Sequence, residues 1–480
     1  MSTVKLCEQV NVRYEADVVV VGGGVAGAAA AIAAARGGKR TLLIEKSGCL
    51  GGLATNGHVS PFDATKDNSG NTFGGIGKEI IDRMVIYQDK YGCPKSASKR
   101  VGPHLFKAVL LDLATEAGVD ILFHADVIKT VAEDDEVKNL IIHTKSGIEA
   151  VSAKMFIDAT GDGDIFAEAG EEFVMGCEPE SGTDLKNAGF DHMHFEINSS
   201  SKYDTEEAKK ILAVQPCSVM FSMGNVDMTQ NPIKYNNKNL KFEDLGIDRD
   251  EFFSLEYAGT VGFEENGDLI PLPQGRILFF PSGRPNELIV NMSRVIGVDG
   301  TDAVELSKAA VIAHKQVIYL ADFLKRYVPG FEESYLVESS NVLGVRETRR
   351  LVGMHVLKGL DAINCVHYDD EIACGSYIID IHDPFGKSRA LGGAIHGDSY
   401  GIPYGCIAPK RVKNLLVCGR CISVDHIAHS STRIQGTCVM TGQAAGAAAA
   451  VALDTGTTVQ TVDVQKVREA LKNDGVLLRQ

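Results

Sequence analysis

The chain has 480 residues, of which 44% are hydrophobic and 23% charged, and its formal net charge is −15. At about 150 residues per domain, this length predicts about three domains with a large buried core and excludes a small disulfide-stapled fold. An acidic chain without a long lysine and arginine cluster lacks the electrostatic surface that nucleic acids require, so we expect no nucleic-acid partner.

The cysteines and the apolar runs bear on compartment and metal binding. Eleven cysteines are spread thinly along the chain, which is typical of reduced thiols in a cytoplasmic protein. The close pair Cys418 and Cys421 has no second pair at metal-binding spacing, so we expect no metal site. The N-terminal segment lacks the apolar core of a signal peptide, and no run reaches the roughly 18 apolar residues of a membrane span. We therefore expect a soluble, cytoplasmic protein with no membrane partner.

The first predicted unit is a strand, a helix and a second strand. Four consecutive valines at 18–21, bounded by Asp17 and glycines, predict a strand buried on both faces of a parallel sheet. The alanine-rich run at 26–36 suits a helix packed tightly against that sheet. TLLIE at 41–45 supplies a second buried strand. The chain thus opens with a βαβ unit.

The remaining elements follow in three stretches. Residues 119–157 alternate short apolar segments with turns, which predicts a β-meander whose last segment rejoins the parallel sheet. Beyond about Glu172 the pattern is irregular, apart from a long amphipathic helix predicted over 302–327. Residues 414–419 and 441–453 then supply a buried strand and a small-residue helix, so we expect the C-terminal part to close the first domain.

Glycines follow the first predicted strand in the spacing of a dinucleotide-binding turn. Gly22, Gly24 and Gly27 form G-x-G-x-x-G between strand and helix, and Glu45 ends the second strand about 20 residues later. The glycines allow a tight turn and the close approach of a pyrophosphate to the helix N-terminus. A carboxylate at Glu45 binds an adenosine ribose and disfavours a 2′-phosphate, so FAD or NAD fits better than NADP.

Further motifs favour FAD. Gly51 and Gly52 allow the backbone to lie against a flat ring system, and Thr55 offers a hydrogen bond to phosphate or flavin. With DATGDGD at 158–164 and GTCVMTGQAAG at 436–446, the sequence resembles the FAD-dependent oxidoreductase family. More distantly, it is similar to the fumarate reductase and succinate dehydrogenase flavoproteins. The resemblance implies an enzyme with FAD as its cofactor. A second G-x-G-x-x-G unit would indicate a separate NAD-binding domain, and the sequence has no such unit.

The resemblance also implies which residues contact FAD. Residues 159–162 would line the adenosine and pyrophosphate side, and Gly419 and Arg420 the ribityl or pyrophosphate region. Gln443 and Ala444 would sit at the N-terminal turn of the closing helix, whose positive dipole stabilises a reduced flavin. The predicted cofactor-binding residues are Gly22, Gly24, Val25, Ala26, Gly27, Glu45, Lys46, Gly51, Gly52, Ala54, Thr55, Val127, Ala159, Thr160, Gly161, Asp162, Gly419, Arg420, Gly436, Gln443 and Ala444.

Together these features predict the fold class and the domain division. We expect an α/β fold in which a Rossmann-like FAD-binding domain, with a parallel sheet and a β-meander, carries an inserted α+β substrate or cap domain. The predicted ranges are 1–172 and 385–458 for the discontinuous FAD-binding domain, 173–384 for the cap domain, and 459–480 for a C-terminal helix and tail.

Two departures limit the resemblance. Flavoproteins that hold FAD covalently in the fumarate reductase branch carry a histidine just before the Gly-Gly loop, whereas this chain has Ser47, Gly48 and Cys49. The His-Pro-Thr substrate segment of fumarate reductases is missing too, since no His-Pro occurs in the sequence. We therefore expect neither covalent attachment through histidine nor succinate or fumarate as the substrate.

Histidine and arginine are concentrated near the C-terminal motifs, at His382, Arg389, His396, His426, His429 and Arg433. Hydride exchange at flavin N5 requires a proton donor or acceptor and a clamp for an anion or a carbonyl, and imidazole and guanidinium groups suit these tasks. Arg433 is the strongest candidate because it immediately precedes the closing helix. The predicted catalytic residues are Arg433, His396, His382 and Arg349.

Some of these residues have alternative roles. Arg346 and Arg349 could share a helix face and brace two domains through Glu347 and Glu338. His192-x-His194 places two imidazoles on one side of a strand, but no third ligand is nearby, which disfavours a metal.

The sequence thus predicts an FAD-dependent oxidoreductase that transfers a hydride between flavin N5 and a small organic substrate. The reaction is oxidation of a CH–OH or CH–NH centre, or reduction of an activated C=C bond, and the resemblance leaves both directions open. One alternative is an electron-transfer flavoprotein subunit that relies on a partner protein, and another is a non-catalytic FAD-binding redox module. The partners considered are a small-molecule substrate, an electron-transfer protein and further copies of the chain.

Overall fold

The computed structural model describes residues 9–62, 74–91, 102–177, 214–230, 245–246, 278–382 and 391–479. Its strands are β1 (Val12–Val21), β2 (Thr41–Glu45), β3 (Asp120–Phe123), β4 (Asp126–Glu133), β5 (Glu136–Thr144), β6 (Gly147–Asp158), β7 (Phe173–Val174), β8 (Phe221–Gly224), β9 (Phe279–Pro281), β10 (Leu288–Val290), β11 (Tyr335–Ser339), β12 (Arg350–Leu351), β13 (Glu371–Gly375), β14 (Ile379–Ile381), β15 (Leu391–Gly393), β16 (Tyr400–Pro403) and β17 (Leu415–Val417). Its helices are α1 (Val25–Arg36), α2 (Gly75–Lys90), α3 (Pro103–Glu116), α4 (Asp164–Glu168), α8 (Ala303–Tyr327), α9 (Gly359–Ile363), α10 (His426–Thr432), α11 (Gln435–Thr455) and α12 (Val464–Asn473), with short 3-10 turns such as η6 (Gly419–Cys421).

Seven of the described strands form the largest sheet, in the order β3-β2-β1-β6-β5-β4, with β17 also paired to β6. The strands β3, β2, β1, β6 and β17 run parallel, whereas β4, β5 and β6 form an antiparallel meander. The predicted α/β class, the βαβ opening and the returning meander are therefore confirmed. Strand β1 begins at Val12, earlier than predicted, because its first residues pair with Ala150 and its neighbours on β6.

The four valines of β1 explain why the sheet is buried on both faces. Val18 and Val20 pack into the core that contains α1 and α11, and Val19 and Val21 pack into the core on the meander side. Because side chains alternate along a strand, only an unbroken apolar run fills both cores.

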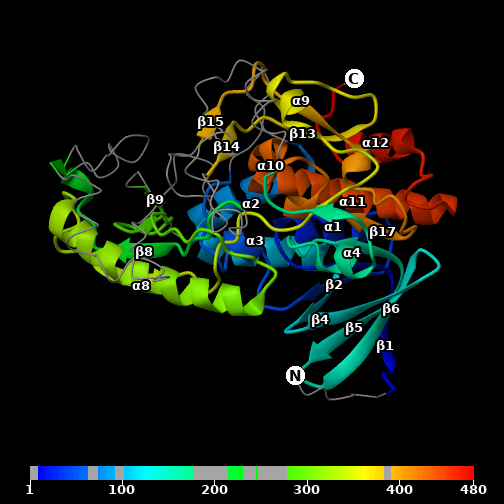
Figure 1. Ribbon diagram of the computed structural model, residues 1–480, viewed down its shortest axis with the longest axis horizontal. Helices are drawn as coiled ribbons and strands as arrows, with labels where there is room; N and C mark the ends of the chain where they lie inside the picture. Colours follow the sequence, from blue (N-terminus) through cyan, green and yellow to red (C-terminus); the bar gives the residue numbers. More distant parts are fainter. Residues whose placement is uncertain are drawn as a thin grey trace, which may run out of the picture.

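Helices α1 and α11 lie side by side in the helical layer that covers one face of the sheet (Figure 1). A Cβ at Gly442 would lie 2.1 Å from the backbone oxygen of Ala26, and one at Gly446 would lie 2.2 Å from that of Ala30. Their small residues therefore allow this close contact. Among the described residues, α11 is also long and apolar enough to cross a membrane, but 89% of its apolar window is buried within the protein, as in a core helix.

A second sheet, in the order β11-β8-β10-β9, packs with the long helix α8 around a separate core. Asp302 caps α8 by accepting hydrogen bonds from the amides of Val304 and Glu305. The helix buries Ala313, Leu320 and other residues of one face, which confirms the predicted amphipathic helix. Figure 1 shows α8 extending to one side of the molecule, beside β8 and β9.

The predicted domain boundaries remain a prediction. Strand β13 pairs with β16, and its residues Ile372 and Ala373 lie in the same core as α1 and α11. Both residues fall in the range 173–384 that the sequence assigns to the cap domain, so parts of this range contribute to the core of the first domain.

Candidate functional site

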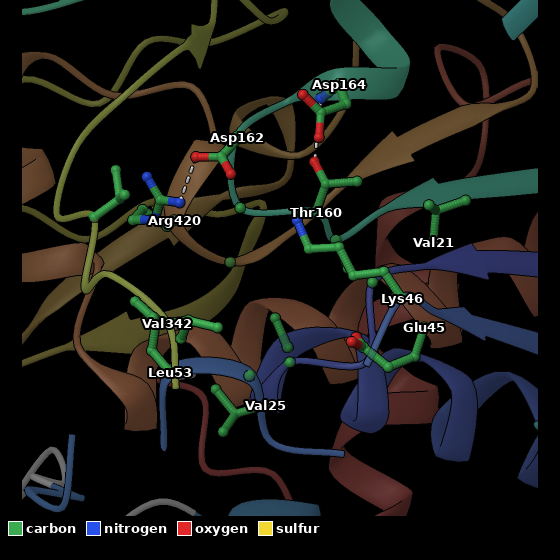
Figure 2. Close-up of a pocket in the computed structure, with 18 of the residues that line it drawn as sticks. Val21, Val25, Glu45, Lys46, Leu53, Thr160, Asp162, Asp164, Val342 and Arg420 are labelled. Carbon is green, nitrogen blue, oxygen red and sulfur yellow. Dashed lines mark hydrogen bonds and ion pairs between the residues drawn. The ribbon is translucent and has the colours of Figure 1, made fainter. Parts of the chain in front are cut away.

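A cavity of 540 Å³ lies where the loops after β1, β2 and β6 meet. The carboxyl ends of parallel strands are where open α/β sheets bind their ligands. Figure 2 shows its wall, with Glu45 and Lys46 on one side and Arg420, Leu53 and Val342 on the other. The predicted cofactor-binding residues that line it are Gly22, Gly24, Val25, Ala26, Glu45, Lys46, Gly51, Gly52, Ala54, Val127, Ala159, Thr160, Gly161, Asp162, Gly419 and Arg420.

The glycine turn between β1 and α1 has three distinct roles. Gly22 adopts a φ of 99°, and a Cβ there would lie 2.5 Å from the backbone oxygen of Ala159. A Cβ at Gly27 would lie 1.8 Å from the backbone oxygen of Gly22, so this residue is required for packing and does not line the cavity. Gly24 differs, because a Cβ there would meet no atom within 4 Å. Its open side is available to a ligand.

The N-terminus of α1 faces this cavity without a side-chain cap. Gly24 is the N-cap residue, and within the described ranges no side chain caps this end of the helix. Gly24, Val25 and Ala26 all line the cavity. Uncapped amides and the positive end of a twelve-residue helix suit a pyrophosphate.

Glu45 is held at the end of β2 by two backbone amides. Its Oε2 accepts from Gly23 N at 2.6 Å, and its Oε1 accepts from Ser47 N at 2.7 Å. The residue is only 7% exposed and lines the cavity. Glu45 therefore joins the glycine turn to the next loop and presents a carboxylate of fixed orientation, as the ribose-binding prediction requires.

The Gly-Gly loop lies against the glycine turn. Gly51 N donates to Gly23 O at 2.8 Å, and a φ of 108° at Gly51 requires glycine. The hydroxyl of Thr55 is directed into its own loop, where it donates to the backbone oxygen of Leu50 at 2.9 Å. Thr55 is fully buried and is not part of the cavity wall, so it stabilises the loop that the cavity requires.

Asp158, at the end of β6, organises the following loop. It is fully buried and accepts hydrogen bonds from the amides of Thr160, Ile165 and Phe166. Burial raises the pKa of its carboxyl. These contacts shape the segment 159–164, of which the sequence predicted residues 159–162 to line the site.

Asp164 adds a second perturbed carboxyl to this loop. Burial and the charges of Asp158 and Asp162 raise its pKa to about 6, and the guanidinium of Arg349 opposes this shift. Its backbone amide donates to Thr160 Oγ1 at 3.1 Å, as Figure 2 shows. Asp164 lines the cavity although it is outside the predicted set.

Arg349, predicted as catalytic, is outside the cavity wall and braces this loop. Its Nε donates to Asp162 O at 2.8 Å, and its Nη2 pairs with Asp164. The bracing role that the sequence left open is thus present, but its partners are Asp162 and Asp164. Glu338 and Glu347, the partners predicted for it, contact other side chains.

The start of the closing helix was predicted wrongly. Helix α11 begins at Gln435, so Gln443 and Ala444 lie within the helix and not in its first turn. Gln443 Oε1 accepts from Ile76 N at 3.0 Å, which ties α11 to α2. Gly436 is buried and is also outside the wall, which Gln435 and Cys438 form in its place.

Arg433 is the predicted catalytic residue that lines the cavity. Its Nη2 donates to Gln215 Oε1 at 3.1 Å and to Asp380 O at 3.0 Å. The backbone amide of His382 donates to the same Gln215 oxygen at 3.2 Å, so His382 lies beside Arg433, behind the wall. His396 is exposed and contacts Asn364 Oδ1 at 3.2 Å, away from the cavity.

Other histidine and arginine candidates are placed as follows. His426 is buried and contacts Glu347 Oε1 at 2.9 Å. Burial opposes ionisation of Glu347, but the positive charges of His426 and Arg350 outweigh it and hold its pKa below the usual range. His192, His194 and Arg389 lie outside the described residues.

A further part of the wall comes from residues that the sequence did not assign to the site. Its remaining lining residues are Val21, Ile44, Leu53, Ala125, Asp126, Asp164, Ile165, Gly300, Leu306, Ser307, Ala310, Val342, Leu343, Val345, Gln435 and Cys438. Helix α8 supplies three of them. The amphipathic sequence pattern predicts this helix. It does not predict that the first turns of the helix line a cavity.

One cluster outside the cavity has the residue types of a metal site. Among the described residues, His367, Glu371 and Cys374 bring their ligand atoms within 4.8 Å of one another. Both ring nitrogens of His367 are engaged, by Glu371 Oε2 at 2.7 Å and Ser399 O at 2.9 Å. Burial, followed by the charge of Glu371, raises the pKa of Cys374 to about 12. Hydrogen bonds between these side chains therefore explain why they lie close together.

The chain is similar to several solved structures. It is 16% identical to a geranylgeranyl bacteriochlorophyll reductase-like protein from Thermoplasma acidophilum, covering 96% of this chain and 83% of that one, with a TM-score of 0.42. It is 12% identical to the myxobacterial chondrochloren halogenase CndH, covering 96% and 79%, with a TM-score of 0.47. It is 11% identical to p-nitrophenol 4-monooxygenase PnpA from Pseudomonas putida DLL-E4, covering 95% and 84%, with a TM-score of 0.44. No curated protein matches the chain.

The cavity fits the cofactor that the sequence motifs imply. The uncapped start of α1, the open side of Gly24 and the fixed carboxylate of Glu45 are the features that hold a pyrophosphate and a ribose. The model of the family described as FAD dependent oxidoreductase matches residues 17–471. The chain therefore belongs to the FAD dependent oxidoreductase family and is a flavoenzyme with FAD as its cofactor.

Proposed function

We propose that this enzyme transfers a hydride between flavin N5 and a small organic substrate that binds beside Arg433. The reaction is either the oxidation of a CH–OH or CH–NH centre or the reduction of an activated C=C bond. The observation that carries the proposal is that one cavity joins the glycine turn and Glu45 to Arg433, Gln435 and Cys438. A cofactor and a substrate can therefore share it.

The chain's residues divide into a cofactor end and a substrate end. When bound, FAD supplies a two-electron acceptor or donor, which the protein side chains lack. Glu45 and the start of α1 suit the ribose and the pyrophosphate, and Arg420 lies on the opposite wall, paired with Asp162 (Figure 2). Leu53 and Val342 line that wall with apolar side chains (Figure 2), which favour a site with little water around the reacting centre.

The substrate end contains a cation and a protonated thiol. The guanidinium of Arg433 suits an anionic or carbonyl group, and the backbone amide of His382 shares its contact with Gln215. Burial raises the pKa of Cys438 to about 12, so the thiol remains protonated at neutral pH and does not act as a nucleophile.

The experiment is anaerobic rapid mixing of the FAD-loaded enzyme with hydroxy acids, amines and sugars, and of the pre-reduced enzyme with enoates. We expect one compound class to change the flavin absorbance. With a hydroxy acid, amine or sugar, the rate should fall when deuterium replaces hydrogen at the reacting carbon, and with an enoate it should fall when the flavin is reduced in D₂O so that N5 carries deuterium. Arg433→Met should slow that step at least tenfold, whereas Arg83→Met, which removes a surface arginine paired with Glu116, should leave it unchanged. An absorbance change without an isotope effect would contradict hydride transfer.

A further inference from the structure

Three arginines from separate segments gather around Gln215, and one of them, Arg433, lines the substrate end of the cavity. Arg294 and Arg346 lie outside the cavity wall. Arg433 donates to Gln215 Oε1, and Arg346 donates to the backbone oxygen of the next residue, Pro216. Arg294 belongs to the segment whose next residue, Val295, pairs with Cys217. Arg294 is 3% exposed, and the other two are only partly exposed. The three are called the arginine cluster below.

The arginine cluster has an excess of positive charge. Burial lowers the pKa of Arg294, and the charges of Arg346 and Arg433 lower it further. Burial and the charge of Arg433 likewise lower the pKa of Arg346 to about 10. Among the described residues, Asp380 is the carboxylate whose charge opposes these shifts. Three cations thus face one anion in a setting where unpaired charges are costly.

Several hydrogen-bond donors of the cluster also lack acceptors. Arg294 Nη2, Arg433 Nε and Gln215 Nε2 are buried with no hydrogen-bond partner in the described part of the chain. The acceptors that Arg294 does contact, Asn291 Oδ1 at 2.9 Å and Ser293 O at 2.7 Å, are neutral and leave its charge uncompensated. Buried donors normally have partners, so this arrangement indicates an acceptor other than the described residues.

We propose that the arginine cluster binds an oxyanion group of the substrate, a carboxylate or a phosphate, beside Arg433. This inference rests on the proposed function, because it names the substrate class of the same cavity. Guanidinium groups offer planar pairs of donors that match the oxygens of a carboxylate or phosphate. The pyrophosphate of the cofactor has its own binding elements at the start of α1, so the cluster is available to the substrate.

The test measures anion binding to the FAD-loaded enzyme without turnover. Acetate, lactate, succinate and inorganic phosphate are titrated at constant ionic strength, with acetamide and lactamide as neutral counterparts. The readouts are the thermal unfolding midpoint and the visible flavin spectrum. We expect at least one anion to raise the midpoint saturably and to shift the spectrum, while its neutral counterpart does neither. The carboxylate and phosphate arms identify which oxyanion the cluster prefers.

Variants locate the anion. Arg294→Met and Arg346→Met should each weaken anion binding at least tenfold, whereas Arg83→Met should not change it. If Arg294→Met does not fold, Gln215→Leu removes an unpartnered donor and Arg346→Lys retains the charge, and both should weaken binding. The proposal is overturned if no anion binds saturably, if lactamide binds as well as lactate, or if Arg83→Met weakens binding as the cluster variants do.

The two proposals fail separately. Saturable anion binding with no flavin reduction or reoxidation by any compound would support the arginine cluster and contradict hydride transfer. Flavin reduction by an uncharged substrate, with no anion effect, would support hydride transfer and overturn the assignment of an oxyanion substrate.

Discussion

Arg420 donates a hydrogen bond from Nη2 to Oδ1 of Asp162 at 2.6 Å, and this ion pair joins two loops that are 258 residues apart in the sequence. Thr348 connects the same groups, since it accepts from Arg420 Nη1 at 3.1 Å and donates to Asp162 Oδ1 at 2.8 Å. Figure 2 shows the pair on the cavity wall. The η6 turn after β17 and the loop after β6 are thereby fixed to one another around the cofactor site.

Replacement of Arg420 should destabilise the protein and weaken FAD binding. Arg420→Met leaves the mostly buried Asp162 without its cation, which we expect to cost about 2 kcal/mol of unfolding free energy. The double variant Arg420→Met with Asp162→Asn should recover part of that loss. Denaturant unfolding of the four proteins measures the coupling, and strictly additive losses would contradict a direct interaction.

Two glycines of the same turn should respond to alanine in opposite ways. Gly24→Ala places a methyl group in open space at a φ of −62°, so the apoprotein should unfold at the wild-type midpoint while FAD binds at least tenfold more weakly. Gly27→Ala places the methyl group against the backbone oxygen of Gly22 and should prevent normal folding. Thermal unfolding of the apoproteins and FAD titration separate these effects. Unchanged FAD affinity in Gly24→Ala would place the cofactor elsewhere.

Loss of the Glu45 carboxylate should disrupt the cofactor end. Glu45→Ala removes the acceptor for the amides of Gly23 and Ser47, at a cost of about 2 kcal/mol. It also removes the predicted ribose ligand, so FAD affinity should fall at least tenfold in a titration of the apoprotein. The control is Glu79→Ala, which removes an exposed carboxylate paired with Arg36 and should have little effect on FAD binding. Equal effects of the two variants would exclude a specific role for Glu45.

The pH dependence of stability should contain a contribution from Asp164. Unfolded Asp164 loses its proton near the ordinary pKa of 3.8, whereas the folded protein holds that proton up to about pH 6. The folded state therefore binds more protons in this window, and Asp164 lowers stability as the pH rises from about 4 to 6. Asp164→Asn should be relatively more stable at pH 7 than at pH 4. Chemical denaturation of both proteins at the two pH values checks this, and a constant stability difference would contradict it.

Most residues that the sequence predicted for the cofactor end line one cavity because their signals are local. The glycines and Glu45 belong to one strand–turn–helix–strand unit, whose spacing determines where they lie. The start of α11 was missed because Ile434 provides no side-chain cap and the first turn contains Gly436 and Thr437, both weak helix formers.

The substrate end depends on contacts between distant segments, which one sequence does not contain. Arg349 was predicted as catalytic from its residue type, but Asp162 and Asp164 determine its role. Arg294 carries no motif, and the proposal for it arises only because the fold places it near Arg346 and Arg433. Residue type thus supplied candidates for this region, while tertiary structure determined which of them lie near one another.

The most direct measurement is the visible absorption spectrum of the purified protein, with the FAD released on denaturation measured per chain. The account predicts flavin absorption bands that bleach on anaerobic reduction, and one FAD per chain after reconstitution. A colourless protein that FAD cannot reconstitute would contradict the assignment of this cavity as a cofactor site.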